Sequence, residues 1–588
     1  MSDLSNMRET CLSYEKLAKR VNGRPDQIAK VHKILDEIRS DLTSETINRF
    51  GQMIDYTVGK LYDGINFELP KGLDFKKLSE ENNIILVPNH QSHADYIGMS
   101  YVLWNEYRST IYIAGGINLN IFPIGPLFRK SGCFFIRRSF NNDILYKLTL
   151  ESYVYYLLVN KKTIEFFFEG GRSRTGKLLP PRFGFFSMIL ETYSQIKNPL
   201  PLLFIPVSIS HEVVPEQKSH VRELDGKKKE KETSKGLLKI FKLMNKKLGT
   251  IHIKMNEPIV ANTHYTDLKK ATQDLAFECY RSVGKGMMVT PTSLLALIML
   301  DEPNGAMIWE SILAKSQHII KYCEQYNVPV SSSLKGERLE KSMVISLDLQ
   351  IENGKVKVIK AEKLGKVYYA IKEENRLELL YFKNTILHHF LVPGFIFSSW
   401  VYVFTGHIKD ENDLKKFYLY QRKQMKYEFY LPTIKELYKL SLLIISDCLG
   451  RKVTDLSEVF NLTHLEAYSI AKKVGGFSRS YSHIHEGYYI GLLALKHFSD
   501  KPFTLEKFLQ ASKEIFEMEA SHGRLIKYRE SYSLPLLKNS MLYFENLKLI
   551  EKDHGEIIVV KKEEVGHLIE KYVTYLNELL TFNLKLEN

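Results

Sequence analysis

Short apolar runs recur between residues 84 and 255 and form the clearest pattern in this chain. They lie at Ile84–Val87, Thr110–Ala114, Cys133–Ile136, Thr163–Phe168, Leu202–Ile209 and Thr250–Met255. Segments long enough for helices, such as Asp143–Leu158 and Phe185–Ile196, separate several of these runs. Strands that alternate with helices favour a largely parallel sheet, and runs that are apolar on both faces are typical of strands covered on two sides. The pattern therefore predicts an α/β domain.

The rest of the chain is expected to be mainly helical. We expect a helical N-terminal region, the α/β domain, a helical segment with a β-hairpin, and a mainly helical C-terminal region, at residues 1–80, 81–265, 266–385 and 386–588. The hairpin is predicted from Asn353-Gly354, which stands between Val344–Ile351 and Lys355–Ile359. Asn-Gly is the strongest short-range signal for a tight turn between two strands.

The uncharged stretch Phe390–Thr405 leaves two interpretations open. At about sixteen residues, with Pro393-Gly394 inside, it is short for a membrane-spanning helix, which needs roughly 20. It fits a core helix, and with Trp400 and Tyr402 it also fits a segment in contact with a membrane interface. The shorter run Leu294–Leu300 predicts a core helix.

Composition and charge narrow the class of protein. The chain has 588 residues, of which 44% are hydrophobic and 26% charged, which excludes wholesale disorder and favours several folded domains. Its five cysteines are far apart, so the sequence indicates neither a zinc site nor a disulfide framework, and a reducing compartment fits best. The N-terminal stretch is polar and does not predict a signal peptide. A net charge of +14 suits nucleic acid, anionic lipid or phosphorylated small molecules as partners.

The turn after Ile84–Val87 carries the first candidate chemistry. The sequence Asn89-His90-Gln91-Ser92-His93-Ala94-Asp95 places a histidine and, five residues later, an aspartate at the end of a predicted strand, where functional groups collect in open α/β sheets. His90 is suited to accept a proton from a hydroxyl, and Asp95 to fix its tautomer. No serine or cysteine nucleophile follows nearby, which suggests that the hydroxyl belongs to the substrate. The alternative is a polar turn in which Asp95 caps the next helix.

Two loops that contain arginine follow predicted strands. Arginine forks suit phosphate oxygens, and glycines allow a close approach of the backbone. Both loops should leave the sheet at the edge that carries His90, so together they predict a phosphorylated substrate that bears the hydroxyl. Each loop alone also fits a solvated surface loop. The residues are Arg137 and Arg138 after Cys133–Ile136, and Glu169, Gly170, Gly171, Arg172, Ser173, Arg174 and Lys177 after Thr163–Phe168.

Two features of the basic loops leave alternatives open. Glu169 is either a second acid/base group or, as we prefer, a group that orients an arginine or the loop backbone. A third basic segment, Glu223–Glu232, precedes a probable amphipathic helix. Its Lys229 and Lys231 either reach the phosphate or belong to a solvated face.

The His90 turn, the two arginine loops and the run Ile205-Pro206-Val207 form four sequence blocks. In their order and spacing these blocks resemble the glycerophosphate acyltransferase family. Within that family the chain is most similar to the large bacterial glycerol-3-phosphate acyltransferases and the related dihydroxyacetone-phosphate acyltransferases. The subgroup is supported by 223–232 and 384–390, and the resemblance is strong over about 80–260 and continues to about 405. The blocks are Asn-His-x-x-x-x-Asp at 89–95, Gly-x-Phe-Phe-Ile-Arg-Arg at 132–138, Glu-Gly-Gly-Arg-Ser-Arg-Thr-Gly at 169–176, and Ile205-Pro206-Val207.

The resemblance implies a mixed, largely parallel sheet flanked by helices and a specific reaction. His90 would be the general base on the primary hydroxyl of glycerol 3-phosphate, oriented by Asp95, and the product would be lysophosphatidate. The acyl donor would be acyl-coenzyme A or acyl carrier protein, and we expect no metal and no other cofactor. Phosphate binding would fall to Arg137, Arg138, Arg172 and Arg174, with Lys177, Lys229 and Lys231 as weaker candidates and Glu169, Gly170, Gly171 and Ser173 in the same loop. Gly132 and Pro206 would serve the acyl donor or the fold.

A lipid product and a basic chain together predict peripheral attachment to the cytoplasmic face of the cell inner membrane, through its anionic surface. The sequence does not distinguish acyl transfer to glycerol 3-phosphate from the same reaction with dihydroxyacetone phosphate as the acceptor. A different class of protein is suggested by Leu534–Val560, which has the helix-then-hairpin pattern of a winged helix. Because the lysines are not concentrated there, we expect no nucleic-acid partner.

Overall fold

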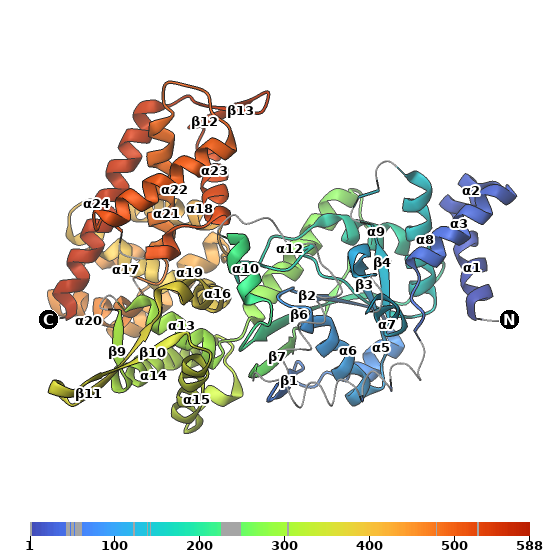
Figure 1. The fold of residues 1–588 in the computed structure, drawn as a ribbon, viewed down its shortest axis with the longest axis horizontal. Coiled ribbons are helices and arrows are strands. Elements are labelled where there is room, and N and C mark those ends of the chain that lie inside the picture. The colour runs from blue at the N-terminus through green and yellow to red at the C-terminus, as the bar shows by residue number, and fades with distance from the viewer. Residues whose placement is uncertain are drawn as a thin grey trace. The chain divides into compact units, whose positions relative to one another are not determined.

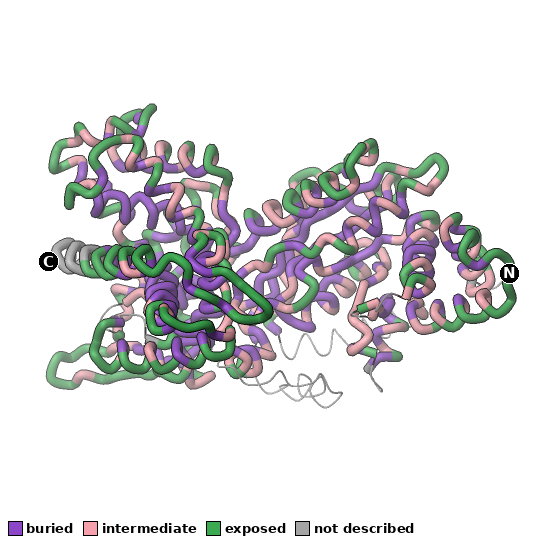
Figure 2. Tube along the Cα trace, turned by 90° about the horizontal axis from the view of Figure 1, so that it is seen from above, coloured by how far each residue is buried: buried purple, intermediate pink, exposed green. Residues whose placement is uncertain are grey.

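A computed structural model of the chain describes residues 3–42, 48, 52, 62–120, 124–137, 139–140, 143–224, 248–302, 305–477, 479–525 and 528–587 (Figure 1). Its contacts divide the chain into two compact units. The sheet unit comprises Met1–Ser173, Leu178–Glu216 and Lys229–Thr290, and the helical unit comprises Arg174–Lys177, Gln217–Lys228 and Pro291–Asn588. In Figure 2 the buried residues follow the inner segments of both units. The four regions expected from the sequence stay predictions.

The sheet unit is built on eight strands in the order β1-β7-β6-β2-β5-β3-β4, with β8 paired to β6. Five pairs are parallel and two, β6 with β7 and β6 with β8, are antiparallel. The predicted mixed, largely parallel sheet is therefore confirmed. The strands are β1 (Gly64–Glu68), β2 (Asn83–Pro88), β3 (Ile111–Gly116), β4 (Cys133–Ile136), β5 (Thr163–Glu165), β6 (Leu202–His211), β7 (Thr250–Met255) and β8 (Ile259–Val260).

Helices cover both faces of this sheet, as the two-sided apolar runs predict. One face, which includes Ile85 and Phe166, packs on the first three helices and on α8, α9 and α12. The other, which includes Leu86 and Ile113, packs on α5, α6 and α7. The helices are α1 (Asp3–Ser13), α2 (Glu15–Val21), α3 (Pro25–Ile38), α5 (Phe75–Glu81), α6 (Ala94–Tyr107), α7 (Ile124–Lys130), α8 (Ile144–Val159), α9 (Phe183–Tyr193) and α12 (Leu268–Gly286).

Two details of the sheet differ from the sequence prediction. Strand β1 lies at Gly64–Glu68, inside the region expected to be helical, and pairs with β7. It is only half-buried along its length, so its sequence has no strongly apolar run. Strand β5 ends at Glu165, three residues before the predicted Phe168. The N–H of Phe166 still donates to the Leu86 carbonyl of β2 at 3.1 Å, but the paired registers with β2 and β3 end at Glu165.

The helical unit is made mostly of helices, with a three-stranded and a two-stranded sheet. Its elements are α10 (Gln217–Leu224), α13 (Pro291–Asp301), β9 (Ala306–Ile308), α14 (Trp309–Gln325), α15 (Arg338–Glu352), β10 (Val356–Ala361), β11 (Lys366–Ile371), α16 (Arg376–Ile386), α17 (Leu391–Phe404), α18 (Glu411–Met425), α19 (Ile434–Leu449), α20 (His464–Val474), α21 (Ser482–His497), α22 (Leu505–Ser521), α23 (Leu534–Asn546), β12 (Ile550–Asp553), β13 (Glu556–Val559) and α24 (Lys562–Glu587). The predicted core helix at 294–300 and the helix-then-hairpin at 534–560 are both present.

The predicted hairpin around Asn353-Gly354 is wrong. Its first half is helix α15, in which Leu339, Met343 and Leu347 are buried at helical spacing. Asn353 is the C-cap of this helix, and Gly354 has a φ of +72°, the left-handed conformation that commonly ends a helix. A hairpin does exist, between β10 and β11, but its turn lies at Glu362–Gly365. The Asn-Gly signal thus marked a helix end rather than a two-residue turn.

The uncharged stretch forms α17, whose residues Leu391 to Tyr402 are buried. One helical run among the described residues, Glu373–Phe404, is long and apolar enough to cross a membrane, but 89% of its most apolar window is buried inside the protein. Such burial is what a core helix shows, so the structure favours the core interpretation.

Candidate active site

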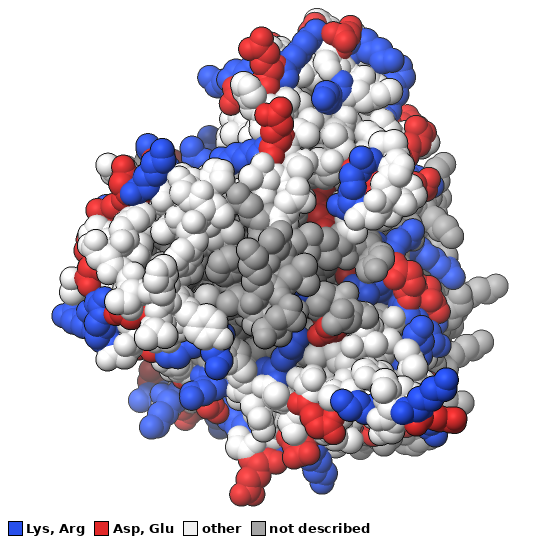
Figure 3. All heavy atoms as spheres, turned by 90° about the vertical axis from the view of Figure 1, so that its left-hand side faces the viewer, with Lys and Arg blue, Asp and Glu red and all other residues white. Residues whose placement is uncertain are grey.

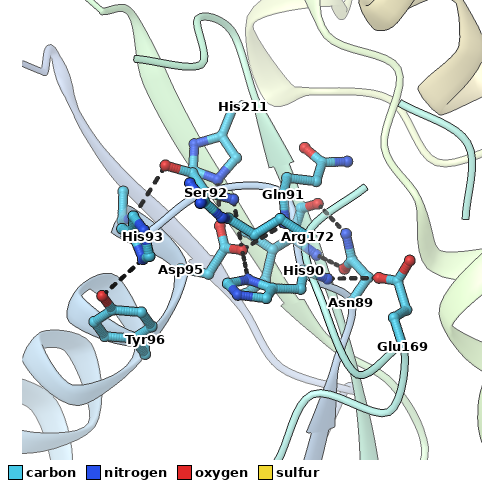
Figure 4. Close-up of polar contacts among 12 residues, drawn as sticks. Asn89, His90, Gln91, Ser92, His93, Asp95, Tyr96, Glu169, Arg172 and His211 are labelled. Atoms are coloured by element: carbon cyan, nitrogen blue, oxygen red, sulfur yellow. Dashed lines mark hydrogen bonds and ion pairs between the residues drawn. The ribbon is translucent and has the colours of Figure 1, made fainter. Parts of the chain in front are cut away.

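The turn between β2 and α6 holds His90 against Asp95. Nδ1 of His90 lies 2.8 Å from Oδ2 of Asp95 (Figure 4). Because an ionised carboxylate only accepts hydrogen bonds, His90 donates from Nδ1, which leaves its Nε2 as the acceptor. The ring also stacks on Phe167, with ring centres 4.0 Å apart. The imidazole is thus fixed in both orientation and tautomer, with 13% of its side chain exposed.

Asp95 is surrounded by hydrogen-bond donors. Besides His90, it accepts from the backbone amides of Gln91 at 2.7 Å and Ser92 at 2.9 Å, and Nε2 of His211 lies 2.6 Å from its other oxygen. The side chain lies inside the first turn of α6, whose N-cap residue is His93, so Asp95 is not the helix cap of the alternative interpretation. A carboxylate at the start of a helix is also favoured by the helix dipole.

Burial and hydrogen bonding have opposing effects on the pKa values of Asp95 and His90. Burial opposes the charge on Asp95, but hydrogen bonds from His211 and His90 hold the pKa of Asp95 well below its usual range. Burial lowers the pKa of His90, and the Asp95 carboxylate offsets this only in part. At neutral pH the site therefore contains a neutral imidazole beside an ionised carboxylate, which is the state that a general base needs.

The loop after β5 is tied to the His90 turn by its backbone. Glu169 accepts from the backbone N–H of His90 at 2.6 Å and of Leu179 at 2.8 Å, and the backbone N–H of Ser173 donates to the His90 carbonyl at 2.8 Å. Burial raises the pKa of Glu169 to about 8, although the two backbone donors favour its charged form. These contacts correspond to the loop-orienting role that we prefer for Glu169.

Arg172 is the cation that this loop brings close to His90. Its Nη1 lies 3.1 Å from Oε1 of Glu216, and only 9% of its side chain is exposed. Glu216 also accepts from the Ser92 hydroxyl at 2.9 Å and from the backbone N–H of His93 at 3.1 Å. It thus connects the arginine loop to the His90 turn. The positive charge of Arg172 is close enough to lower the pKa of His90.

Sequence reasoning missed His211 and Glu216. His211 ends β6, the strand next to β2, and Glu216 follows five residues later. Neither stands in a recognisable motif, since the first is the last residue of a ten-residue strand and the second ends the short turn that follows it. The parallel pairing of β2 with β6, which the tertiary structure establishes, places them at the His90 edge. The second histidine of the turn, His93, is buried and bonds to the Tyr96 hydroxyl at 3.0 Å.

No group of three or more His, Cys, Asp or Glu side chains that could hold a metal ion occurs within the part of the chain that the structure describes.

Comparison with known proteins places this geometry in a family. A model of the acyltransferase family matches residues 73–210, and a model of the glycerol-3-phosphate acyltransferase C-terminal region matches residues 220–553. The second match alone spans more than half of the chain. The chain belongs to the glycerol-3-phosphate acyltransferase family.

Individual relatives agree with this assignment. The chain is 33% identical over 408 residues to a glycerol-3-phosphate acyltransferase of Xanthomonas campestris pv. campestris, an alignment that covers 65% of this chain and 44% of the relative. It is 30% identical over 387 residues to a glycerol-3-phosphate acyltransferase of Actinobacillus pleuropneumoniae serotype 5b, covering 63% and 46%. A third such protein, from Pasteurella multocida, is 30% identical over 384 residues, covering 62% and 46%. The aligned part therefore spans about half the length of these curated relatives.

The second arginine block of this glycerol-3-phosphate acyltransferase family member lies further along the sheet. Strand β4 points the same way as β2 but is separated from it by β5 and β3, or roughly 14 Å at about 4.8 Å per strand. Arg137, which follows it, forms a two-pronged ion pair with Glu37, at 2.7 and 2.6 Å. At Gly132 the φ is +113° and a Cβ would lie 2.2 Å from the Ile111 carbonyl oxygen, so only glycine fits.

The end of the Glu-Gly-Gly-Arg-Ser-Arg-Thr-Gly block belongs to the helical unit. Nε of Arg174 lies 3.0 Å from Glu223, and Lys177 is ion-paired with Glu428. At Gly176 the φ is +80° and a Cβ would lie 1.9 Å from the Tyr381 carbonyl oxygen. The structure therefore brings together His90, Asp95, Glu169, Arg172 and Ser173, but gives Arg174 and Lys177 carboxylate partners of their own.

The remaining predicted positions complete this account. A Cβ on Gly171 would meet nothing within 4 Å, whereas one on Gly170, at a φ of +69°, would meet Arg182. Pro206 is buried in β6 opposite Val87. Arg138, Lys229 and Lys231 lie outside the described residues.

Proposed function

We propose that this protein is a glycerol-3-phosphate 1-O-acyltransferase. It transfers a fatty acyl group from acyl-coenzyme A or acyl carrier protein to the sn-1 hydroxyl of glycerol 3-phosphate and forms lysophosphatidate for phospholipid synthesis. One observation carries the proposal: in a chain of this family, Nδ1 of His90 lies 2.8 Å from Asp95, which leaves Nε2 to accept a proton near the cation Arg172. The names of the relatives support the same acceptor.

The proposed reaction needs one proton carrier and a good leaving group. Nε2 of His90 takes the proton of the primary hydroxyl while that oxygen attacks the thioester carbonyl carbon. The imidazolium that forms is stabilised by Asp95, whose charge His211 and two backbone amides hold in place. As the tetrahedral intermediate collapses, the carbon–sulfur bond breaks and the thiolate receives the proton from His90. Bonds and protons balance in this step, and no other cofactor is proposed.

Arg172 is the residue that we propose for the substrate phosphate. An arginine fork binds phosphate oxygens more strongly than a lysine does, and the loop that carries Arg172 is fixed to the His90 turn through Glu169 and Ser173. Phosphate binding to Arg172 would replace part of the ion pair between Arg172 and Glu216. Arg137, Arg138, Arg174, Lys177, Lys229 and Lys231 remain proposals for the same role; Arg137, Arg174 and Lys177 would have to give up carboxylate contacts to take it.

We also propose peripheral attachment to the anionic cytoplasmic face of the cell inner membrane. The lipid product and the net charge of +14 support it. On the face shown in Figure 3 the described lysines and arginines do not form one continuous basic surface, because acidic residues are interspersed among them. A local surface, rather than the whole protein, would then make the contact.

The test is a thiol-release assay with the purified chain, palmitoyl-coenzyme A and glycerol 3-phosphate. We expect thiol release that needs the acceptor and that falls by about 10²–10⁴-fold in His90→Ala, the usual contribution of a general base. His264→Ala is the matched control, because His264 is exposed and lies outside the site. Acyl carrier protein as the thioester carrier is the second arm.

The outcomes of this assay distinguish the proposed function from the alternatives. Preference for dihydroxyacetone phosphate would leave the site intact and change the acceptor. Release that persists in His90→Ala would remove His90 as the base. Absence of release with either acceptor and either carrier, in the presence of lipid, would overturn the acyltransferase proposal for this chain.

A further inference from the structure

The helical unit contains a pocket of about 380 Å³ that has no part in the proposed reaction. Residues of α13, α14, α20 and the short turn Gly475–Phe477 line it, together with Arg479. The volume is in the range of small-molecule binding sites. The pocket therefore has the size of a ligand site, and its lining indicates which ligand.

One part of the pocket wall is apolar. Leu297 and Ile298 of α13, Ile319 of α14 and Ala471 of α20 contribute hydrocarbon, and all four are buried. At Gly476 a Cβ would meet only His318, at 4.0 Å, so this side of the pocket is open rather than filled. Such a wall suits a hydrocarbon chain.

The other part of the wall is cationic. Lys315, Lys472 and Arg479 line the pocket together with one carboxylate, Asp301, which is ion-paired with Lys383 at 2.5 Å. Lys315 is itself ion-paired with Glu302 at 3.1 Å. Arg479 is only 8% exposed, so its guanidinium faces an interior surface rather than bulk water. Lys472 and Arg479 on one wall of the pocket favour an anion, and arginine with lysine favours phosphate.

The pocket mouth continues onto an exposed strip of α20. Leu465, Tyr468 and Lys472 follow one another at helical spacing, and the latter two line the pocket. Leu465 is 82% exposed and Tyr468 is 53% exposed. A leucine, a tyrosine and a lysine on one exposed face are typical of residues that meet a bilayer at its headgroup level. A ligand could thus enter from a lipid surface.

We propose that this pocket binds a single-chain lipid with a phosphate headgroup. The chain lies along Leu297, Ile298 and Ile319, and the phosphate is held by Lys472 and Arg479. Only the choice of lysophosphatidate as probe rests on the proposed function, whose product it is. The chemistry of the pocket is independent of it.

A local chemical readout tests the proposal on the full chain. Acetylation of Lys315 and Lys472 is followed by mass spectrometry, with a short-chain lysophosphatidate kept below its micelle concentration. At ten times Kd we expect acetylation of both lysines to slow by about tenfold, since only the free fraction reacts. Glycerol 3-phosphate, which lacks the chain, and lysophosphatidylcholine, whose headgroup is zwitterionic, should give no protection.

Matched variants locate the effect. Gly476→Leu fills the open wall and should abolish the protection, whereas Gly566→Leu, at another glycine with open space in the same unit, should not. Lys472→Met should weaken protection of Lys315 by about tenfold, the usual size of one charge-assisted contact, and Lys538→Met on α23 should leave it unchanged.

Three results would overturn the proposal: equal protection by glycerol 3-phosphate, equal protection by the choline lipid, or protection that survives Gly476→Leu. Failure of thiol release with intact protection of Lys472 would remove the proposed function and leave this site standing.

Discussion

At the scale of single residues, two buried carboxyl groups of the sheet unit, Asp95 and Glu165, differ in their hydrogen bonding. Asp95 accepts from two histidines and two backbone amides. Glu165, at the end of the neighbouring strand β5, is equally buried, but neither of its carboxylate oxygens has a hydrogen-bond partner among the described residues. Burial and the nearby charge of Asp95 raise the pKa of Glu165 well above its usual value. A buried carboxyl group is therefore ionised at Asp95 and protonated at Glu165.

This difference predicts a pH-dependent gain in stability for Glu165→Gln. The folded state keeps a proton on Glu165 that the unfolded chain releases above about pH 4.5, so Glu165 costs stability as the pH rises from there towards its folded pKa. Glutamine has no proton to release. We therefore expect little difference at pH 5 and a gain at pH 8 that grows by up to about 1.4 kcal/mol per pH unit.

The measurement is hydrogen exchange of peptides from β2 and β5 in the full chain at both pH values. Glu106→Gln is the control, because Glu106 is exposed on α6 and should give no pH-dependent difference. Equal stabilities of Glu165→Gln and the unchanged chain at pH 8 would mean that Glu165 is ionised in the fold and has a partner outside the described residues.

At the scale of elements, the loop after β5 divides into two parts with different neighbours. Glu169 to Ser173 bond to the His90 turn, while Arg174 to Lys177 belong to the helical unit. Asn384 donates to the Thr175 carbonyl at 2.9 Å, and Lys177 is paired with the fully buried Glu428. Basic residues of one continuous motif thus have different contacts, because the chain passes from one unit into the other between Ser173 and Arg174.

The ion pair of Lys177 gives a prediction that distinguishes structure from phosphate binding. Lys177→Met leaves Glu428 buried and without its cation, which should destabilise the helical unit by about 3–5 kcal/mol. Adding Glu428→Gln removes the unpaired buried charge, so the double variant should regain most of the lost stability. Its KM for glycerol 3-phosphate should also return to that of the unchanged chain. Denaturant unfolding and steady-state kinetics measure the two effects. A double variant that is stable but keeps a raised KM would make Lys177 a phosphate ligand.

At the scale of the whole molecule, membrane attachment does not have to use the most apolar segment. Helix α17 is buried along Leu391 to Tyr402, and Phe395 is fully enclosed against Tyr481. Its apolar character is explained by the core of the helical unit. A membrane contact would then have to come from exposed residues elsewhere in the protein.

Burial of α17 predicts different fates for two charges on the same helix. Phe395→Glu should unfold the helical unit, because losing a buried phenylalanine alone costs about 3–5 kcal/mol and the buried charge adds to it. Phe404→Glu, at a position that is 48% exposed, should fold normally and still bind anionic vesicles. Thermal unfolding by circular dichroism and vesicle sedimentation give the two readouts. If both variants fold but fail to sediment with vesicles, α17 enters the membrane after all.

The sequence by itself determined most of the sheet and the pairing of two residues in its central turn. Apolar runs of strand length located six of the eight strands, because a strand buried on both faces has almost no polar positions. His90 and Asp95 were predictable as a pair because both lie in one short turn. The half-buried β1, the short β8 and the helix end at Asn353-Gly354 were not, since their local patterns are weak or shared by two structures.

Only the tertiary structure decided which distant residues complete the site. His211 and Glu216 join it because β6 lies beside β2, a pairing between positions more than a hundred residues apart. Arg174 and Lys177 are held in the helical unit because their carboxylate partners come from α10 and from beyond α18. The local sequence pattern indicates how a segment is buried. The partner of a charged residue instead depends on the chain topology, which is established only in the folded structure.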